Sequence, residues 1–302
     1  MFQAVVPTAT RPIIRRWLAF SVTTAKGLKR LLYRKPRQWS VNLENQTLKA
    51  QEYAGYVVLS SRGTSLMSRL QNASDVYEPQ LVKALSREIK RREARWFLDV
   101  GANIGLISLA VLRRFPYLKI EAFDPGPHQY QLFNATIRYN HLEPQVHLHQ
   151  IALSDDDGET DFFVHADEHV SGDGMVDTGR SGSARKIRVP TQRLDSWWNW
   201  SQKPDIPIVK IDTEGAELLV LRGAARFLAQ CRPTLFLEIW PGNMHHYPYQ
   251  ARDILVWLNE HNYRLETLKG ESVNSATSNR FWGHDITFVA KHMLQQEMHK
   301  GA

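Results

Sequence analysis

The sequence predicts an α/β fold built on an open, mostly parallel sheet with helices on both faces. Short apolar runs alternate with helical segments from residue 96 onward, and the strands of a parallel sheet need such crossovers. A glycine turn joins the first of these strands to its helix. The last two strands are separated by a loop of Ser, Asn and Gly residues, which predicts an antiparallel pair. At 302 residues, the chain can hold one such domain and a smaller appendage.

The predicted elements follow one another in a regular order. Residues 39–62 contain short strands, and a helix runs from Tyr77-Glu78-Pro79 toward Lys90. The alternating elements after it are strand 96–100, helix 104–114, strand 118–123, helix 127–139, strand 145–151, strand 207–211, helix 215–229, strand 234–239, helix 250–261 and strands 263–268 and 285–290. A polar, glycine-rich stretch from Ser154 to Ser183 interrupts this order, with short strand-like pieces at 160–164 and 186–189.

Charge divides the chain unevenly. Residues 1–37 hold nine Lys and Arg and no acid, so the remainder has 29 basic and 31 acidic residues and a net charge of −2. A body this close to neutral argues against a nucleic-acid groove. We therefore divide the chain into four segments, which are a basic leader at 1–38, a small β segment at 39–75, the main α/β domain at 76–292 and a tail at 293–302.

The leader has the pattern of a basic amphipathic helix over residues 12–35, with Trp17 on its apolar side. Residues 11–35 could lie on an anionic membrane surface, pack on the body or act as an organelle-targeting segment. The longest apolar runs are too short to span a bilayer. Cys231 is the single cysteine, which fits a reducing compartment. We expect a cytoplasmic protein, with peripheral membrane contact left open.

The glycine turn after the first strand of the main domain carries an unusual acid. A dinucleotide loop has the pattern G-x-G-x-x-G, so that a pyrophosphate can sit on bare backbone at a helix N-terminus. Here Asp99 occupies the first glycine position, ahead of Gly101 and Gly105. A carboxylate there repels a pyrophosphate and suits a cationic ligand. The turn therefore favours S-adenosylmethionine (SAM), which carries an ammonium and a sulfonium group, over a nicotinamide cofactor.

A second acid stands where a ribose partner belongs. Asp124 ends the second strand, 19 residues after Gly105, and its two oxygens can accept both ribose hydroxyl protons. Residues after the third strand should border the adenine, because ligands bind at the carboxyl ends of the strands. The predicted donor contacts are Asp99, Gly101, Ala102, Asn103, Gly105, Asp124, Pro125, Ala152 and Leu153.

Acids also cluster after the fourth and fifth strands. Strand alternation places Lys210 and Asp212 on the same side of the fourth strand. Asp212, Glu214 and Glu238 could deprotonate or orient a hydroxyl, and Asp212 with Glu238 could instead hold a divalent cation such as Mg²⁺. Glu238 could also simply pair with Lys210. The neighbouring Glu217 is better explained as a helix cap.

A histidine loop follows the fifth strand. His245 could act as the base, because the pKa of histidine is near neutrality, or it could be an ordinary surface residue. Tyr247 and Tyr249 could stack on a sugar ring or pack the loop. The sequence leaves both pairs of alternatives open.

Several of these motifs together resemble the FkbM family of SAM-dependent methyltransferases. They are Asp99-Val-Gly-Ala-Asn-Ile-Gly, Ala122-Phe-Asp-Pro, Ala152-Leu-Ser-Asp and Lys210-Ile-Asp-Thr-Glu-Gly-Ala-Glu, within a resemblance that covers roughly 76–290. Many members carry Glu where this chain has Asp124, which keeps the charge.

The resemblance implies a Rossmann-like seven-stranded methyltransferase sheet with its last strand antiparallel. It also implies SAM as the donor and O-methylation of a hydroxyl on a sugar, glycan or natural product. On this basis Asp212 is the first candidate for the catalytic base, followed by Glu214, Glu238 and His245. The acceptor would be a small molecule or glycan. Nucleic-acid or protein methylation and a non-catalytic SAM-binding protein are the alternatives.

Overall fold

The computed structural model describes residues 38–43, 46–61, 76–165, 172–179, 183–201, 205–282 and 286–294. The strands of its central sheet are β4 (Trp96–Val100), β5 (Lys119–Phe123), β6 (Val146–His149), β10 (Ile208–Ile211), β11 (Thr234–Glu238), β12 (Tyr263–Thr267), β13 (Ser272–Val273) and β14 (Thr287–His292). Their order in the sheet is β13-β12-β14-β11-β10-β4-β5-β6. Strands β6, β5, β4, β10 and β11 pair in parallel, and β14 is antiparallel to both of its neighbours. The predicted mostly parallel sheet is confirmed, with the two-residue β13 added to the seven expected strands.

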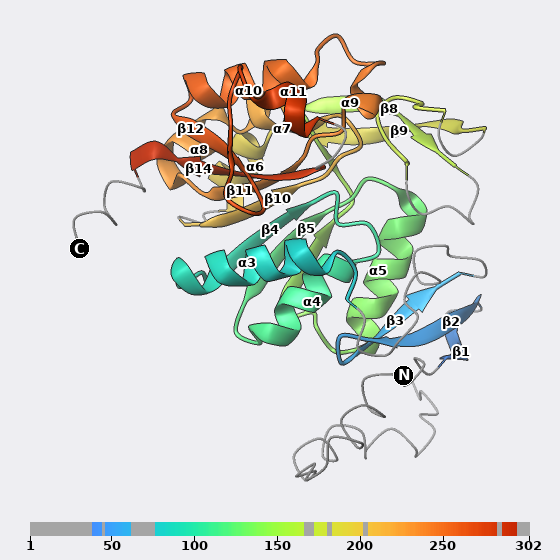
Figure 1. Ribbon diagram of the computed structural model, residues 1–302. Coiled ribbons are helices and arrows are strands. Elements are labelled where there is room, and N and C mark those ends of the chain that lie inside the picture. The colour runs from blue at the N-terminus through green and yellow to red at the C-terminus, as the bar shows by residue number, and fades with distance from the viewer. Residues whose placement is uncertain are drawn as a thin grey trace.

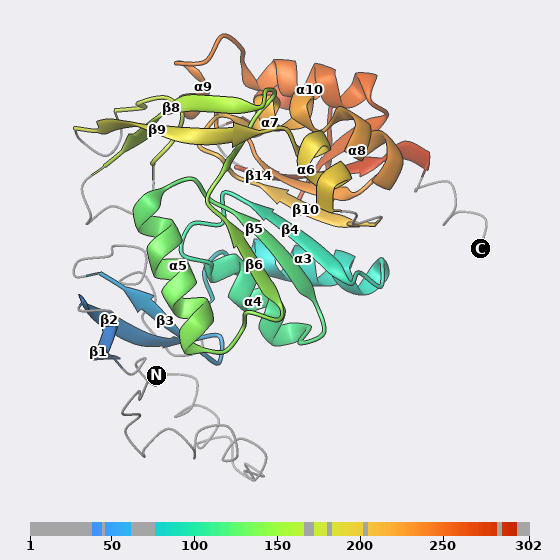
Figure 2. The same ribbon diagram turned by 180° about the vertical axis from the view of Figure 1, so that it is seen from behind.

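Helices cover both faces of this sheet (Figures 1 and 2). One face carries α3 (Pro79–Arg91), α4 (Leu106–Arg114) and α5 (Pro127–Tyr139). The other face carries α6 (Leu194–Ser201), α7 (Glu217–Gly223), α8 (Ala225–Cys231) and α10 (Ala251–Glu260), with the short α9 (Pro241–Met244) and α11 (Ser278–Phe281) in the connections. No helix among the described residues has the length and apolarity needed to cross a membrane.

A hydrophobic core lies on each face of the central sheet, and the alternating side chains of the strands contribute to both. In β4, Phe97 packs with the α3, α4 and α5 side, whereas Leu98 and Val100 pack with the opposite side. All three side chains are fully or almost fully buried. Burying one side chain of this size contributes about 1.5–3 kcal/mol, so this alternation fixes which face of the strand each residue takes.

Two predicted elements differ from those observed. The helix expected at 215–229 is two helices, α7 and α8, that meet at Ala224. A Cβ on Gly223 would lie 1.9 Å from the carbonyl oxygen of Ser154, so the chain here passes directly against another segment. The strand expected at 145–151 ends at His149, and Ala152–Leu153 form a separate strand, β7.

A second small sheet explains this early ending. Strand β7 pairs with β9 (Arg185–Gln192), which pairs with β8 (Gly158–Val164), so the two predicted strand-like pieces are longer strands of one sheet. The chain leaves the central sheet after β6 because residues 152–153 hydrogen-bond to β9 instead. Gly172, Asp173 and Met175, which follow β8, thereby lie near residues at the carboxyl ends of the central strands. Strands β8 and β9 lie side by side near α9 (Figure 1).

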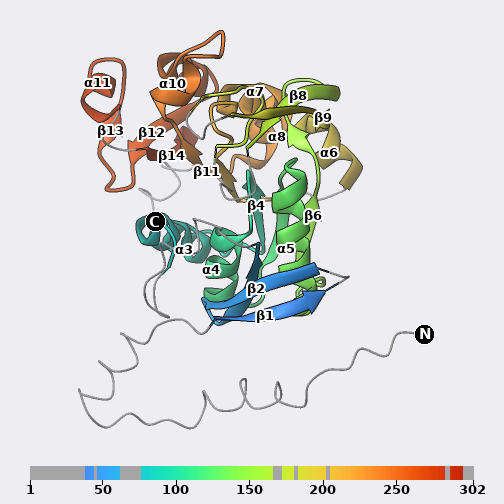
Figure 3. The same ribbon diagram turned by 90° about the vertical axis from the view of Figure 1, so that its right-hand side faces the viewer.

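The N-terminal strands form a third sheet. Strands β1 (Gln38–Leu43), β2 (Gln46–Tyr53) and β3 (Tyr56–Ser60) are antiparallel and lie beside α5 (Figure 3). The backbone N–H of Leu59 donates to the Thr136 hydroxyl at 3.0 Å, and the N–H of Val57 donates to the Asn140 side chain at 2.9 Å. This sheet shares the core of the α3–α5 face. The predicted leader helix, its membrane contact and most of the predicted tail lie outside the described residues.

Candidate active site

A pocket opens at the carboxyl ends of the central parallel strands. It encloses about 1060 Å³, part of it open to solvent. Of the residues predicted to form a site, those that line it are Gly101, Ala102, Asn103, Asp124, Pro125, Ala152, Leu153, Asp212, Glu214 and Glu238. Asp99, Gly105 and His245 are not among the lining residues. The structure therefore brings the two predicted groups, donor contacts and acids, into one pocket.

The glycine turn is shaped by close contacts on both sides. Gly101 has φ 73°, and a Cβ there would lie 1.7 Å from the carbonyl oxygen of Asp212. Gly105 has φ 84°, and its Cβ would lie 2.1 Å from the ring of Phe133. Only glycine fits these two positions, because they combine a left-handed backbone with no room for a side chain.

The backbone donors of this turn are already used by the chain. The N–H groups of Gly101 and Ala102 both donate to the carbonyl oxygen of Phe123, at 2.9 and 3.0 Å. The N–H of Asn103 donates to Asp124 at 2.7 Å. A dinucleotide pyrophosphate needs such donors, so their occupation agrees with the choice of another ligand.

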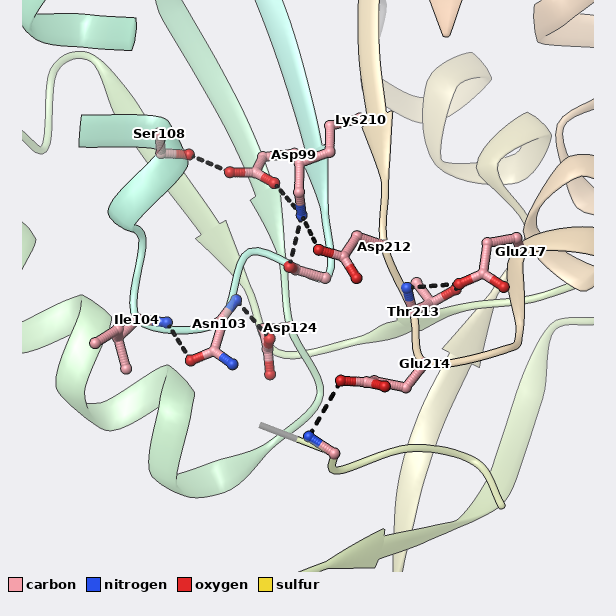
Figure 4. A network of polar contacts seen from close by, with 12 residues as sticks. Asp99, Asn103, Ile104, Ser108, Asp124, Lys210, Asp212, Thr213, Glu214 and Glu217 are labelled. Atoms are coloured by element: carbon pink, nitrogen blue, oxygen red, sulfur yellow. Dashed lines mark hydrogen bonds and ion pairs between the residues drawn. The ribbon is translucent and has the colours of Figure 1, made fainter. Parts of the chain in front are cut away.

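Asp99 lies behind the pocket wall. Its carboxylate is fully buried, accepts a hydrogen bond from the Ser108 hydroxyl at 2.6 Å and lies 3.2 Å from the ammonium of Lys210 (Figure 4). Lys210 also donates to the Gly101 carbonyl at 3.0 Å and lies 3.3 Å from Asp212. In this structure Asp99 pairs with an internal lysine, whereas the sequence predicts a direct contact with a cationic ligand.

Lys210 remains charged although it is buried. Burial by itself lowers the pKa of Lys210, but the negative charges of Asp212, Asp99 and Glu78 more than offset this and raise the pKa above its ordinary value. The predicted proximity of Lys210 and Asp212 on one side of β10 is therefore confirmed, and the pair forms the centre of the acidic cluster.

Asp212 and Glu238 form a pair of neighbouring carboxyl groups in the pocket. Burial, followed by the negative charges of Asp212 and other nearby carboxylates, raises the pKa of Glu238 well above its ordinary value. The two carboxyl groups are hydrogen-bonded, and the Oε2 of Glu238 is buried with no hydrogen-bond partner among the described residues. Because Lys210 stabilises the Asp212 carboxylate, we assign the proton to Glu238, which donates to Asp212. The Asp212 side chain is 30% exposed.

Glu214 and Glu217 have different surroundings. Glu214 lines the pocket, and its two oxygens accept hydrogen bonds from the Gly172 N–H at 3.2 Å and the Asn243 side chain at 2.8 Å. It thus ties the segment after β8 to α9. Glu217 is buried below the 213–215 turn and accepts from the N–H groups of Thr213 and Gly215. Glu217 is the first residue of α7, whose N-cap is Ala216, and its side chain holds the turn that precedes this helix.

Asp124 lies on the wall nearest the predicted ribose position. Its oxygens accept from the N–H groups of Asn103 at 2.7 Å and Gly126 at 2.9 Å. Burial raises the pKa of Asp124 to about 7, and the charge of Asp173 adds to the rise. Asp173 itself lines the pocket and accepts from the Gln129 side chain at 2.8 Å.

Four polar side chains of the pocket lie outside the site residues and motifs that the sequence indicates. Asp173 and Gln129 are two of them, since the segment around Asp173 has only the polar, glycine-rich pattern of a surface loop. Tyr77 and Glu78 are the others, because the sequence around them indicates a helix start and nothing more. In each case the only available signal was a polar residue next to a turn or a helix boundary.

The histidine loop lies away from the pocket lining. His245 is exposed and directly follows α9. Tyr247 and Tyr249 are buried with their ring centroids 5.3 Å apart, and the Tyr249 hydroxyl donates to the Gly215 carbonyl at 2.5 Å. The two tyrosines therefore support the turn after β10. Of the two roles that the sequence allows for them, the structure shows packing of the loop.

The described part of the chain contains no group of three or more His, Cys, Asp or Glu side chains arranged to hold a metal ion. Asp212 instead pairs with Lys210 and Glu238. The Mg²⁺ that the sequence allows at Asp212 and Glu238 thus finds no support in this arrangement.

The chain is similar to several known methyltransferases. The sequence model of the family described as "Methyltransferase FkbM domain" matches residues 99–265. Methyltransferase sdnD of Sordaria araneosa is 29% identical over 172 residues, which are 48% of this chain and 66% of that protein. The 2-O-methyltransferase NoeI of Sinorhizobium fredii is 30% identical over 154 residues, which are 45% of this chain and 59% of that protein. The chain thus spans less than two thirds of the length of these relatives.

Among solved structures, an FkbM methyltransferase from Methylobacillus flagellatus is 14% identical, with a TM-score of 0.42, over 66% of this chain and 44% of that one.

Proposed function

Since the chain belongs to the FkbM family of methyltransferases, we propose that it transfers a methyl group from SAM to a hydroxyl group of a sugar, glycan or natural product. The observation that carries this proposal is Asp212, a pocket carboxylate held beside the glycine turn by Lys210 and Glu238. The name of one relative, the 2-O-methyltransferase NoeI, supports an oxygen atom as the acceptor.

The residues of the pocket fit such a donor. Asp124 presents carboxylate oxygens to a ribose, and Ile151, Ala152 and Leu153 form an apolar wall suited to an adenine ring. The acidic cluster around Lys210 complements a ligand that carries positive charge. When bound, SAM supplies a methyl group on a sulfonium that is already a good leaving group.

The chain would contribute positioning and proton acceptance. Asp212 would accept the proton of the acceptor hydroxyl, to whose oxygen the bound donor would supply its methyl group. Lys210 holds the Asp212 carboxylate in place from one side, and the protonated Glu238 orients it from the other.

The charge of the pocket supports a neutral acceptor. Of the charged side chains that line it among the described residues, only Lys210 is basic, whereas the acids are Glu78, Asp124, Asp173, Asp212, Glu214 and Glu238. A pocket with this excess of carboxylates repels phosphate and carboxylate groups. An uncharged sugar or polyol hydroxyl meets no such repulsion.

The proposal is tested with SAM carrying a labelled methyl group and a panel of neutral mono- and oligosaccharides. Asp212→Asn should lower the rate of methyl transfer by a factor of about 10²–10⁴, because a general base contributes that much, and should leave the affinity for SAM within about threefold. Transfer is followed by scintillation counting and SAM affinity by calorimetry.

The matched control is Asp161→Asn, on β8, whose side chain is 41% exposed and pairs with Lys186. It should behave as the wild type in both measurements. A wild-type chain that binds no SAM would refute the donor, and full transfer by Asp212→Asn would refute the base.

A further inference from the structure

Glu78 occupies an unusual position at the start of α3. It is the N-cap residue, has φ 46° and makes no side-chain capping hydrogen bond. A non-glycine residue with positive φ is uncommon, and such residues cluster at functional sites. Instead of capping its helix, the Glu78 side chain lines the pocket. The backbone conformation thus directs the Glu78 carboxylate into the pocket, and this carboxylate does not cap α3.

The N-terminal sheet holds this segment in place. The backbone N–H of Tyr77 donates to the hydroxyl of Tyr53 at 3.1 Å, and Tyr53 is a fully buried residue of β2. The side chains of Tyr77 and Glu78 are hydrogen-bonded to each other, with the phenol donating to the carboxylate. Glu78 is therefore fixed from outside the central sheet.

The charges around Glu78 leave room for one more cation. Burial, followed by the negative charge of Asp212, raises the pKa of Glu78, whereas the positive charge of Lys210 lowers it. Lys210 also faces Asp99 and Asp212, so one ammonium serves three carboxylates. The buried Oε2 of Glu238, in the same pocket, has no hydrogen-bond partner among the described residues. A bound positive group would relieve this excess of negative charge.

The position of Glu78 in the pocket indicates which part of the donor it can contact. The adenosine of the donor is expected at Asp124 and residues 151–153, so its amino-acid end must extend toward Lys210 and Asp212. Glu78 interacts electrostatically with these two residues. It lies outside residues 99–265, the range that matches the family model.

We infer that Glu78 binds the ammonium group at the amino-acid end of the methyl donor, the contact that the sequence predicts for Asp99. This inference rests on the proposed function, because it takes SAM as the donor. It also gives the N-terminal sheet a role in the pocket, since Tyr53 fixes the segment that carries Glu78.

The test compares three ligands by calorimetry on the full chain. SAM and S-adenosylhomocysteine carry the amino-acid end, and 5′-methylthioadenosine lacks it. Glu78→Gln should weaken binding of the first two by about tenfold, because a charge-assisted contact is lost, and should leave binding of 5′-methylthioadenosine within about twofold. Glu78→Asp, which keeps the charge and tolerates positive φ, should bind all three more nearly as the wild type does.

The possible outcomes distinguish the proposed function from the inference about Glu78. A wild-type chain that binds neither SAM nor S-adenosylhomocysteine refutes the proposed function. A wild type that binds SAM, with Glu78→Gln binding it equally well, overturns only the inference about Glu78. An equal loss for all three ligands also overturns it, because the residue would then act on the shape of the pocket. The exposed Glu93→Gln, just beyond the other end of α3, is the matched control and should change none of the affinities.

Discussion

Lys210 decides the electrostatics of the site at the level of single residues. A buried lysine without partners tends to lose its proton, because burial disfavours the charged form. Here the carboxylates of Asp99 and Asp212 lie 3.2 and 3.3 Å from its ammonium and keep it charged. One cation thus fixes two acids with different roles, Asp99 inside the wall and Asp212 on the pocket surface.

Glu217, which does not line the pocket, should make the stability of the fold depend on pH. Burial raises its pKa to about 7, so the folded chain holds this proton more tightly than the unfolded chain does. Its contribution to the free energy of unfolding is fully present below the unfolded pKa, about 4.5, and is lost as the pH rises through 7. Between pH 5 and 8, the free energy of unfolding of the wild type should fall by on the order of 2–3 kcal/mol more than that of Glu217→Gln. Urea unfolding at both pH values measures this difference.

The carbonyl oxygen of glutamine can still accept from Thr213 and Gly215, so the variant should fold. The pKa of Asp124 is shifted in the same direction, but Asp124 is present in both proteins and its effect cancels. Glu260→Gln, at the exposed end of α10, serves as the control and should keep the wild-type pH dependence. Equal pH slopes for wild type and Glu217→Gln would contradict the assignment.

The close approach of the glycine turn to β10 determines the site at the level of elements. A Cβ on Gly101 would lie 1.7 Å from the backbone oxygen of Asp212, so Gly101→Ala must separate the two segments. We expect this variant to lose SAM binding and about 3 kcal/mol or more of stability. Gly270→Ala has the same kind of backbone, φ 91°, with nothing within 4 Å of the added Cβ, and should cost about 1–2 kcal/mol with normal binding. Calorimetry and urea unfolding distinguish the two, and equal behaviour would disprove the steric argument.

Prediction from sequence was most accurate for elements whose packing is simple. The ends of β4 and α5 agree with the predicted ranges because β4 is a short apolar strand buried on both faces, α5 has one buried face, and both have clear flanking residues. The predicted helix 215–229 was wrong in its continuity, because α7 must give way where Gly223 meets Ser154. That contact joins segments about 70 residues apart in the sequence, so a local sequence pattern cannot predict it.

At the scale of the whole molecule, the pocket is assembled from segments that meet only in the folded chain. The turn after β5, the ends of β10 and β11, the start of α3 and the segment after β8 each supply at least one acid. The net charge of +7 for the whole chain therefore gives no indication of the sign of charge inside the pocket.

This distribution of charge predicts discrimination between acceptors. For any neutral sugar that proves to be methylated, its phosphorylated form should be methylated at least about tenfold less efficiently, because the phosphate would meet the excess of carboxylates. The ratio of kcat/KM for the two acceptors measures the effect. The ratio should fall as salt is raised from about 0.05 to 0.5 M, since ions screen the part of the repulsion that is exposed to solvent. Equal efficiency for both acceptors would contradict the electrostatic argument.

The sequence by itself determined the sheet, the place of the pocket and many of the residues that line it. Apolar strands with periodic helices admit few arrangements, and the residues after parallel strands necessarily gather at one edge. Only the tertiary structure decided which acid faces the pocket. Asp99 points behind the wall toward Ser108 and Lys210, whereas Glu78 enters from a helix start held by another sheet. Side-chain direction depends on contacts between distant segments, and linear spacing carries no record of them.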